Sequence, residues 1–215
     1  MENEEFQLLM KARKNVYDLL RCFFLQEPSE DFLKALRDEN ILNGLRGCNN
    51  HLDEGVELLS SALSSPDLSA LASSLQEEFT RLFVGPLPIP LYESVYRSES
   101  GLVNQEETAA VRGKYLEAGL LIHPDSSFPE DHIGTELEFL YFLAEKASAA
   151  EEKEAQNTLF LFQQEFLRQH LSRWIGPFCD RLFAAAASPY YRGAAKITKG
   201  FVAWDVEELM ADAGD

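Results

Sequence analysis

Apolar positions along this chain recur at intervals of three and four residues, the repeat of an amphipathic helix. The clearest stripe follows Pro66-Asp67, a helix start signal, and contains Leu68, Leu71, Leu75, Phe79, Leu82 and Phe83. The same repeat predicts helices at 5–26, from Ser29 onward, and at 51–63, 67–83, 105–118, 131–148, 153–170, 177–187 and 190–204. No alternating strand pattern and no repeat of about 20–50 residues interrupts them, so we predict an all-α fold and no solenoid.

The helical pattern stops at Gly85-Pro86-Leu87-Pro88-Ile89-Pro90. This segment cannot be the interior of a helix, because each proline fixes φ and lacks an N–H donor. We predict a single globular helical domain over 1–204, with this segment as a hinge between two helical parts, and an acidic tail over 205–215. The hinge is either a stiff connector between two helical parts or a rigid wall that holds Tyr92, Glu93 and Tyr96 in place for contact with a peptide.

Composition narrows the possible partners. The chain has 36 acidic and 19 basic residues and a formal net charge of −17, which disfavours nucleic-acid binding and favours a basic partner. Its three cysteines (Cys22, Cys48, Cys179) are far apart and form no ligand motif, so neither a disulfide framework nor a structural zinc site is expected. The acidic N-terminus does not have the pattern of a signal peptide, and no apolar run is long enough for a membrane span. A cytoplasmic setting is therefore expected.

Candidate chemistry concentrates where a loop turns into a helix, at Pro129–Leu140. Asp131 or the residues just before it can cap this helix, and a histidine in the first turn (His132) is unusual there unless a carboxylate lies near. His132 and Glu136 have i,i+4 spacing, which leaves open an alternative, a helical metalloprotein or enzyme. No second histidine–carboxylate element, nucleophile motif or phosphate-binding loop accompanies them. We therefore expect no catalytic residues, no metal and no cofactor.

Five segments together resemble the TorD/DmsD family of cytoplasmic chaperones for molybdenum-containing oxidoreductases. They are Glu78–Pro86 (EFTRLFVGP), Tyr92–Tyr96 (YESVY), Val111–Leu120 (VRGKYLEAGL), Pro129–Leu140 (PEDHIGTELEFL) and His170–Trp174 (HLSRW). The five segments follow the order and spacing of the family over nearly the whole chain. The resemblance implies an all-helical fold without catalysis. It also implies a system-specific chaperone that binds the twin-arginine signal peptide of an apo-molybdoenzyme, the catalytic subunit of a DMSO- or TMAO-type reductase. Such a chaperone prevents premature export and assists insertion of the molybdenum cofactor.

The resemblance also implies a peptide-binding surface. It assigns Asp131 and His132, with Pro129 before them, and the helix end and turn at Phe79, Leu82, Phe83 and Leu87. Some family members have tryptophan where this chain has Phe79 and Leu87.

The residues themselves add further candidates. Four acids could pair with arginines beside an apolar groove: Asp131, Glu130, Glu136 and Glu93. Tyr92 and Tyr96 could contact the peptide through their rings. His132 is expected to titrate near neutral pH. The client reductase, nucleotide binding and the oligomeric state, monomer or segment-swapped dimer, stay open.

Overall fold

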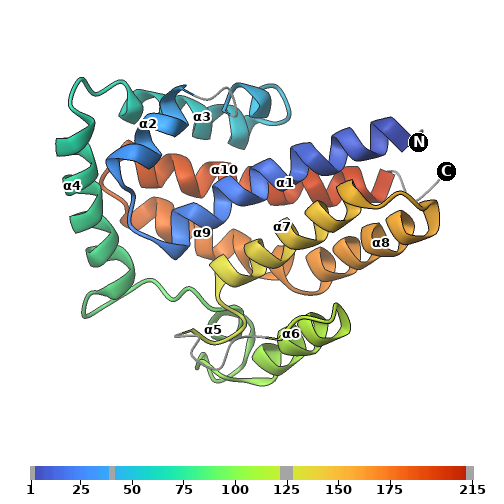
Figure 1. The fold of residues 1–215 in the computed structure, drawn as a ribbon. Coiled ribbons are helices and arrows are strands. Elements are labelled where there is room, and N and C mark those ends of the chain that lie inside the picture. The colour runs from blue at the N-terminus through green and yellow to red at the C-terminus, as the bar shows by residue number, and fades with distance from the viewer. Residues whose placement is uncertain (1–2, 39–41, 122–127, 212–215) are drawn as a thin grey trace. The chain divides into compact units, whose positions relative to one another are not determined.

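The computed structural model describes residues 3–38, 42–121 and 128–211, which are helical almost throughout (Figure 1). The helices are α1 (Asn3–Leu25), α2 (Glu30–Asp38), α3 (Asn50–Leu63), α4 (Leu68–Phe79), α5 (Glu93–Arg97), α6 (Glu106–Glu117), α7 (Ile133–Ala149), α8 (Lys153–Gln169), α9 (Ile175–Ala185) and α10 (Pro189–Ala211). Within the described residues the only β pairing is an isolated bridge between Tyr92 and His132. The all-α prediction is confirmed.

Helix starts follow the capping rules that the sequence indicated. Ser29 Oγ accepts a hydrogen bond from the backbone N of Phe32 at 3.1 Å, and Asp67 Oδ1 accepts one from Ala70 N at 2.9 Å. These acceptors satisfy N–H groups that have no partner within their own helices. None of the helices in the described residues is both long and apolar enough to cross a membrane.

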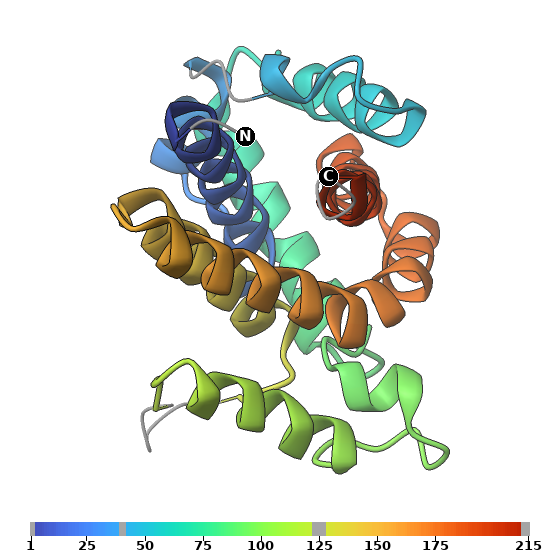
Figure 2. The same ribbon diagram turned by 90° about the vertical axis from the view of Figure 1, so that its right-hand side faces the viewer.

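The chain divides into two compact units, each built from two separate segments. Unit 1 consists of Met1–Leu25 and Tyr92–Trp174. In this unit α1 and α7 lie side by side (Figure 1) and run antiparallel, since Arg21 pairs with Glu138 at 3.2 Å and Lys14 with Glu145 at 3.6 Å. Helix α8 packs against α7 and contacts α1 through the hydrogen bond from Arg13 to Gln163, and Figure 2 shows α6 alongside α8.

Gly134 allows the end of α1 to approach the start of α7 closely. A Cβ atom on Gly134 would lie 2.3 Å from Leu25 Cδ2 and 2.5 Å from Leu25 Cγ. Both distances are well below van der Waals contact, so a side chain at this position would force Leu25 to move. The glycine of the Asp-His-Ile-Gly sequence is therefore explained by packing.

Unit 2 consists of Gln26–Leu91 and Ile175–Asp215, and its longest helix, α10, packs against α3 and α9. After α4 the chain makes a π-helical turn at Thr80–Val84 and enters the proline segment. The chain passes into unit 1 directly after this segment, at Tyr92.

The predicted boundary between domain and tail at 204/205 needs correction. Helix α10 continues through it to Ala211, and Asp205 and Leu209 are 1% and 2% exposed. Leu209 continues the apolar face of α10, so residues 205–211 belong to the helix. The rest of the predicted tail, 212–215, lies outside the described residues.

Candidate functional site

The Asp-His pair joins two segments of unit 1. His132 is the N-cap of α7, and its Nδ1 accepts a hydrogen bond from Gly134 N at 3.1 Å. The Asp131 carboxylate instead accepts a hydrogen bond from Ser94 N at 2.8 Å, and its backbone carbonyl accepts one from Glu93 N at 3.0 Å. The prediction that Asp131 or a residue just before it caps α7 is therefore wrong, because His132 is the cap. Asp131 accepts hydrogen bonds from the first N–H groups of the short helix α5, and His132 caps the start of α7.

Four of the predicted acidic and imidazole groups lie beneath the surface. Asp131, Glu136 and Glu93 are each 0% exposed, and His132 is 1% exposed. Their contacts in this structure are with other parts of unit 1. Direct contact between these side chains and a peptide stays a prediction, and it would require this region to open.

A buried polar network connects the Tyr-Glu-Ser-Val-Tyr and His-Leu-Ser-Arg-Trp segments. The Glu93 carboxylate pairs with Arg97 Nη1 through one oxygen and with His170 Nδ1, at 3.0 Å, through the other. Arg97 also donates to the carbonyl oxygen of Gln169 at 2.9 Å. An arginine and a histidine on one carboxylate compensate the cost of burying its charge. Glu93 is thus a structural link between α5 and the end of α8.

Trp174 provides the second link in this network. Its indole Nε1 donates to Glu136 Oε2 at 3.3 Å. The half-buried Tyr96 ring stacks on Trp174 with centroids 5.4 Å apart and an interplanar angle of 29°. Tyr96 is therefore held between α5 and the Trp174 ring.

Burial shifts the pKa of two of these groups. It raises the pKa of Glu136 well above 4.5, and the negative charge of Glu93 raises it further. Burial lowers the pKa of His132 to about 4, and this outweighs the opposing effect of the Asp131 charge. His132 is therefore neutral near pH 7, and the prediction that it titrates there is wrong. The sequence showed the neighbouring acid but not the depth of burial.

The metalloprotein alternative depended on His132 and Glu136. His132 Nδ1 is occupied by a backbone N–H, and Glu136 is bonded to Trp174. Across the described ranges no group of three or more His, Cys, Asp or Glu side chains could hold a metal ion. The structure supplies no ligand set for that alternative.

An exposed aromatic ring covers the Asp-His pair, and the sequence reasoning missed it. Phe128 is 44% exposed and stacks on the His132 imidazole, with centroids 4.6 Å apart and an angle of 23°. The half-buried Tyr92 ring meets the same imidazole edge-on at 5.4 Å. Pro129, also half-buried, follows Phe128. The available signal was an aromatic residue immediately before the Pro-Glu-Asp-His sequence.

The other predicted contact residues lie in unit 2. Phe79, Leu82 and Phe83 are 9%, 2% and 8% exposed, so they form the interior of the turn. Leu87 is 92% exposed and Val84 is 66% exposed. Of the four residues predicted here, Leu87 is therefore the one whose side chain is available to a partner in this structure.

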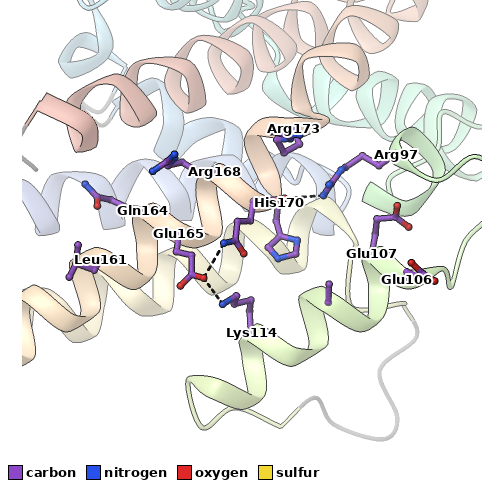
Figure 3. A pocket seen from close by; sticks show the side chains of 12 residues that line it. Arg97, Glu106, Glu107, Lys114, Leu161, Gln164, Glu165, Arg168, His170 and Arg173 are labelled. Carbon is purple, nitrogen blue, oxygen red and sulfur yellow. Dashed lines mark hydrogen bonds and ion pairs between the residues drawn. The ribbon is translucent and has the colours of Figure 1, made fainter.

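A cavity of about 860 Å³ lies between α6 and α8 in unit 1. Arg97 and His170 of the buried network line it, together with Lys114 and Arg168 (Figure 3). Lys114 pairs with Glu165 at 2.9 Å across the two helices. The sequence analysis did not predict this cavity, because its lining comes from segments more than 40 residues apart in the chain.

Comparison with known proteins identifies the class. The family model described as nitrate reductase delta subunit matches residues 49–180, more than half of the chain, and the chain belongs to this family.

Individual relatives are similar over almost their full length. "Chaperone protein TorD" of Vibrio cholerae serotype O1 (strain M66-2) is 27% identical over 220 residues, covering 97% of this chain and 98% of the relative. The protein of the same name from Photobacterium profundum is 27% identical over 218 residues, covering 97% and 99%. A solved structure described as a candidate redox enzyme maturation protein from Archaeoglobus fulgidus has 23% identity and a TM-score of 0.46, covering 89% of this chain and 93% of that one. That score is too low to support an inference.

These relatives confirm the resemblance to the TorD-type chaperones. They are named chaperones and not enzymes, which also confirms the prediction that this chain is not an enzyme.

Proposed function

We propose that this protein binds the twin-arginine signal peptide of an apo-molybdoenzyme, the catalytic subunit of a DMSO- or TMAO-type reductase. By holding the leader in the cytoplasm it prevents premature export of the enzyme, and it assists insertion of the molybdenum cofactor. The predicted binding residues are unchanged and lie in two motif regions. One is the helix end and turn at 79–87, and the other consists of the segments at 92–96 and 129–136. Among them Leu87 has an exposed side chain, and Tyr92, Tyr96 and Pro129 have half-buried ones. Phe128, which the sequence did not predict, adds an exposed ring.

One observation carries this proposal. Exposed apolar side chains border both motif regions, Leu87 in unit 2 and Phe128 in unit 1, in a chain of net charge −17. A twin-arginine leader has a basic segment followed by an apolar one. Apolar side chains can bury the second part, and the acidic field favours the first.

Isothermal titration calorimetry with a synthetic leader peptide tests the proposal. The peptide is taken from a molybdoenzyme encoded in the same genome, and its control has both arginines replaced by glutamine. We expect micromolar or tighter binding of the first peptide and much weaker binding of the second. Binding should weaken with salt, because the Debye length falls from about 10 Å at 0.1 M to about 3 Å at 1 M. Absence of heat with every such leader at low salt would refute the proposal.

The apolar half of the interaction is tested by Leu87→Ser. Burial of a leucine side chain on binding is worth roughly tenfold or more in affinity, so the variant should lose about that much. Its melting temperature should not change, because Leu87 is 92% exposed. Leu102→Ser, at a position that is 62% exposed in unit 1, is the matched control and should bind like the wild type. Equal affinities for the two variants would remove Leu87 from the site.

A further inference from the structure

We propose that Phe128 is a contact residue for an arginine side chain of the leader peptide, and that His132 is a positioning residue that holds the Phe128 ring. This inference rests on the proposed function. In this proposal the Asp-His pair does not touch the peptide itself; it acts by holding the Phe128 ring that covers it.

The geometry gives Phe128 one supported face. The His132 imidazole lies 4.6 Å from the phenyl centroid at 23°, so the two rings are stacked. His132 is fixed in turn, since its Nδ1 accepts from Gly134 N and the Tyr92 ring packs on it edge-on at 5.4 Å. Asp131 completes the support by holding the segment after Tyr92 through Ser94 N. A buried cluster thus holds a ring that is itself 44% exposed.

The chemistry of an exposed, supported phenyl ring suits a guanidinium group. A planar guanidinium stacks on an aromatic face, and the attraction increases as the pair is removed from water. Glu130, two residues after Phe128, is ionised at neutral pH, because Arg112 lowers the pKa of its carboxyl. Because this carboxylate is already paired with Arg112, the exposed ring is the feature of this segment that suits a guanidinium group. The net charge of −17 attracts a basic peptide to it.

A crossed set of proteins and peptides tests the contact. Wild type, Phe128→Ala and the control Leu116→Ala are titrated with the leader and with a version in which both arginines are lysines. Leu116 is 52% exposed on α6 of the same unit. We expect Phe128→Ala to lose about three- to thirtyfold in affinity for the arginine peptide. Against the lysine peptide, which keeps the charge without the planar group, the loss should be less than about twofold. Leu116→Ala should match wild type with both.

The positioning role is tested by a double-mutant cycle with His132→Asn, since asparagine retains a side-chain acceptor for the helix start. In the wild-type background this change should weaken peptide binding, and in the Phe128→Ala background it should have little further effect. Additive losses would overturn the positioning role. Equal losses of Phe128→Ala against both peptides, or none, would overturn the contact while the proposed function stands. If the wild-type protein bound neither peptide, both the Phe128 contact and the proposed function would be refuted.

Discussion

Glu136→Gln tests the buried carboxyl group directly. Glutamine has the shape of the neutral carboxyl and retains an oxygen to accept the Trp174 indole N–H, so the packing is preserved. In the wild type, the folded pKa of Glu136 is raised above its ordinary value of 4.5 by burial and by Glu93. Between these two values the native state holds a proton that the unfolded chain has lost. Wild-type stability therefore falls as pH rises through this window, and the glutamine variant escapes this loss.

The size of the effect follows from the proton count. One proton changes the free energy of unfolding by about 1.4 kcal/mol per pH unit. The difference between Glu136→Gln and wild type should therefore grow by about that amount per unit within the window. For a chain of this size it corresponds to about 3–5 °C in melting temperature per pH unit. The difference in stability stops growing once the pH exceeds the pKa of Glu136 in the folded protein.

Thermal melts of both proteins at several pH values upward from about pH 5 measure this difference. Glu138→Gln, on the same helix with a side chain that is 54% exposed, is the matched control. It should show no such trend. A constant difference between Glu136→Gln and wild type from about pH 5 to about pH 7 would refute the reasoning, because it would mean that Glu136 ionises like a surface carboxyl.

Two further substitutions test the supports of the site. Asp131→Ala removes the acceptor of the buried Ser94 N–H and should lower the free energy of unfolding by about 1–3 kcal/mol in urea denaturation; an unchanged midpoint with weaker peptide binding would make Asp131 a direct contact instead. Gly134→Ala places a methyl group against Leu25 and should cost about 1–3 kcal/mol. Gly113→Ala, where nothing lies within 4 Å of the added carbon, should be neutral or slightly stabilising, and equal effects at the two glycines would contradict the packing argument.

The helices could be predicted because their signals are local. Apolar periodicity, the caps at Ser29 and Asp67, and the prolines before Tyr92 each depend on a few neighbouring residues. Helix α5 was missed because five residues are too few to show a helical period. The end of α10 was placed too early because the acidic residues beyond 204 obscured its apolar face.

The site could be predicted only in part, because its contacts are long-range. The motifs led to Glu93, but its partner His170 is 77 residues away, and spacing alone does not pair them. The burial of Glu136 did have a local signal, since it follows Ile133 by three residues and precedes Leu140 by four, on the apolar face of α7. That position is better evidence for a buried acid than for a surface ligand. Phe128 had no periodic signal at all.

The interleaving of the two units along the chain has a consequence for biosynthesis. Helix α1 leaves the ribosome long before α7, its main neighbour in unit 1. At about 5–20 residues per second, the roughly one hundred residues between them take about 5–20 seconds to translate. During that interval the apolar side chains of α1 that α7 later covers are open to non-native contacts. A chaperone built in this order has its own vulnerable stage, and slowing translation between the codons for Leu25 and Ile133 should lengthen it.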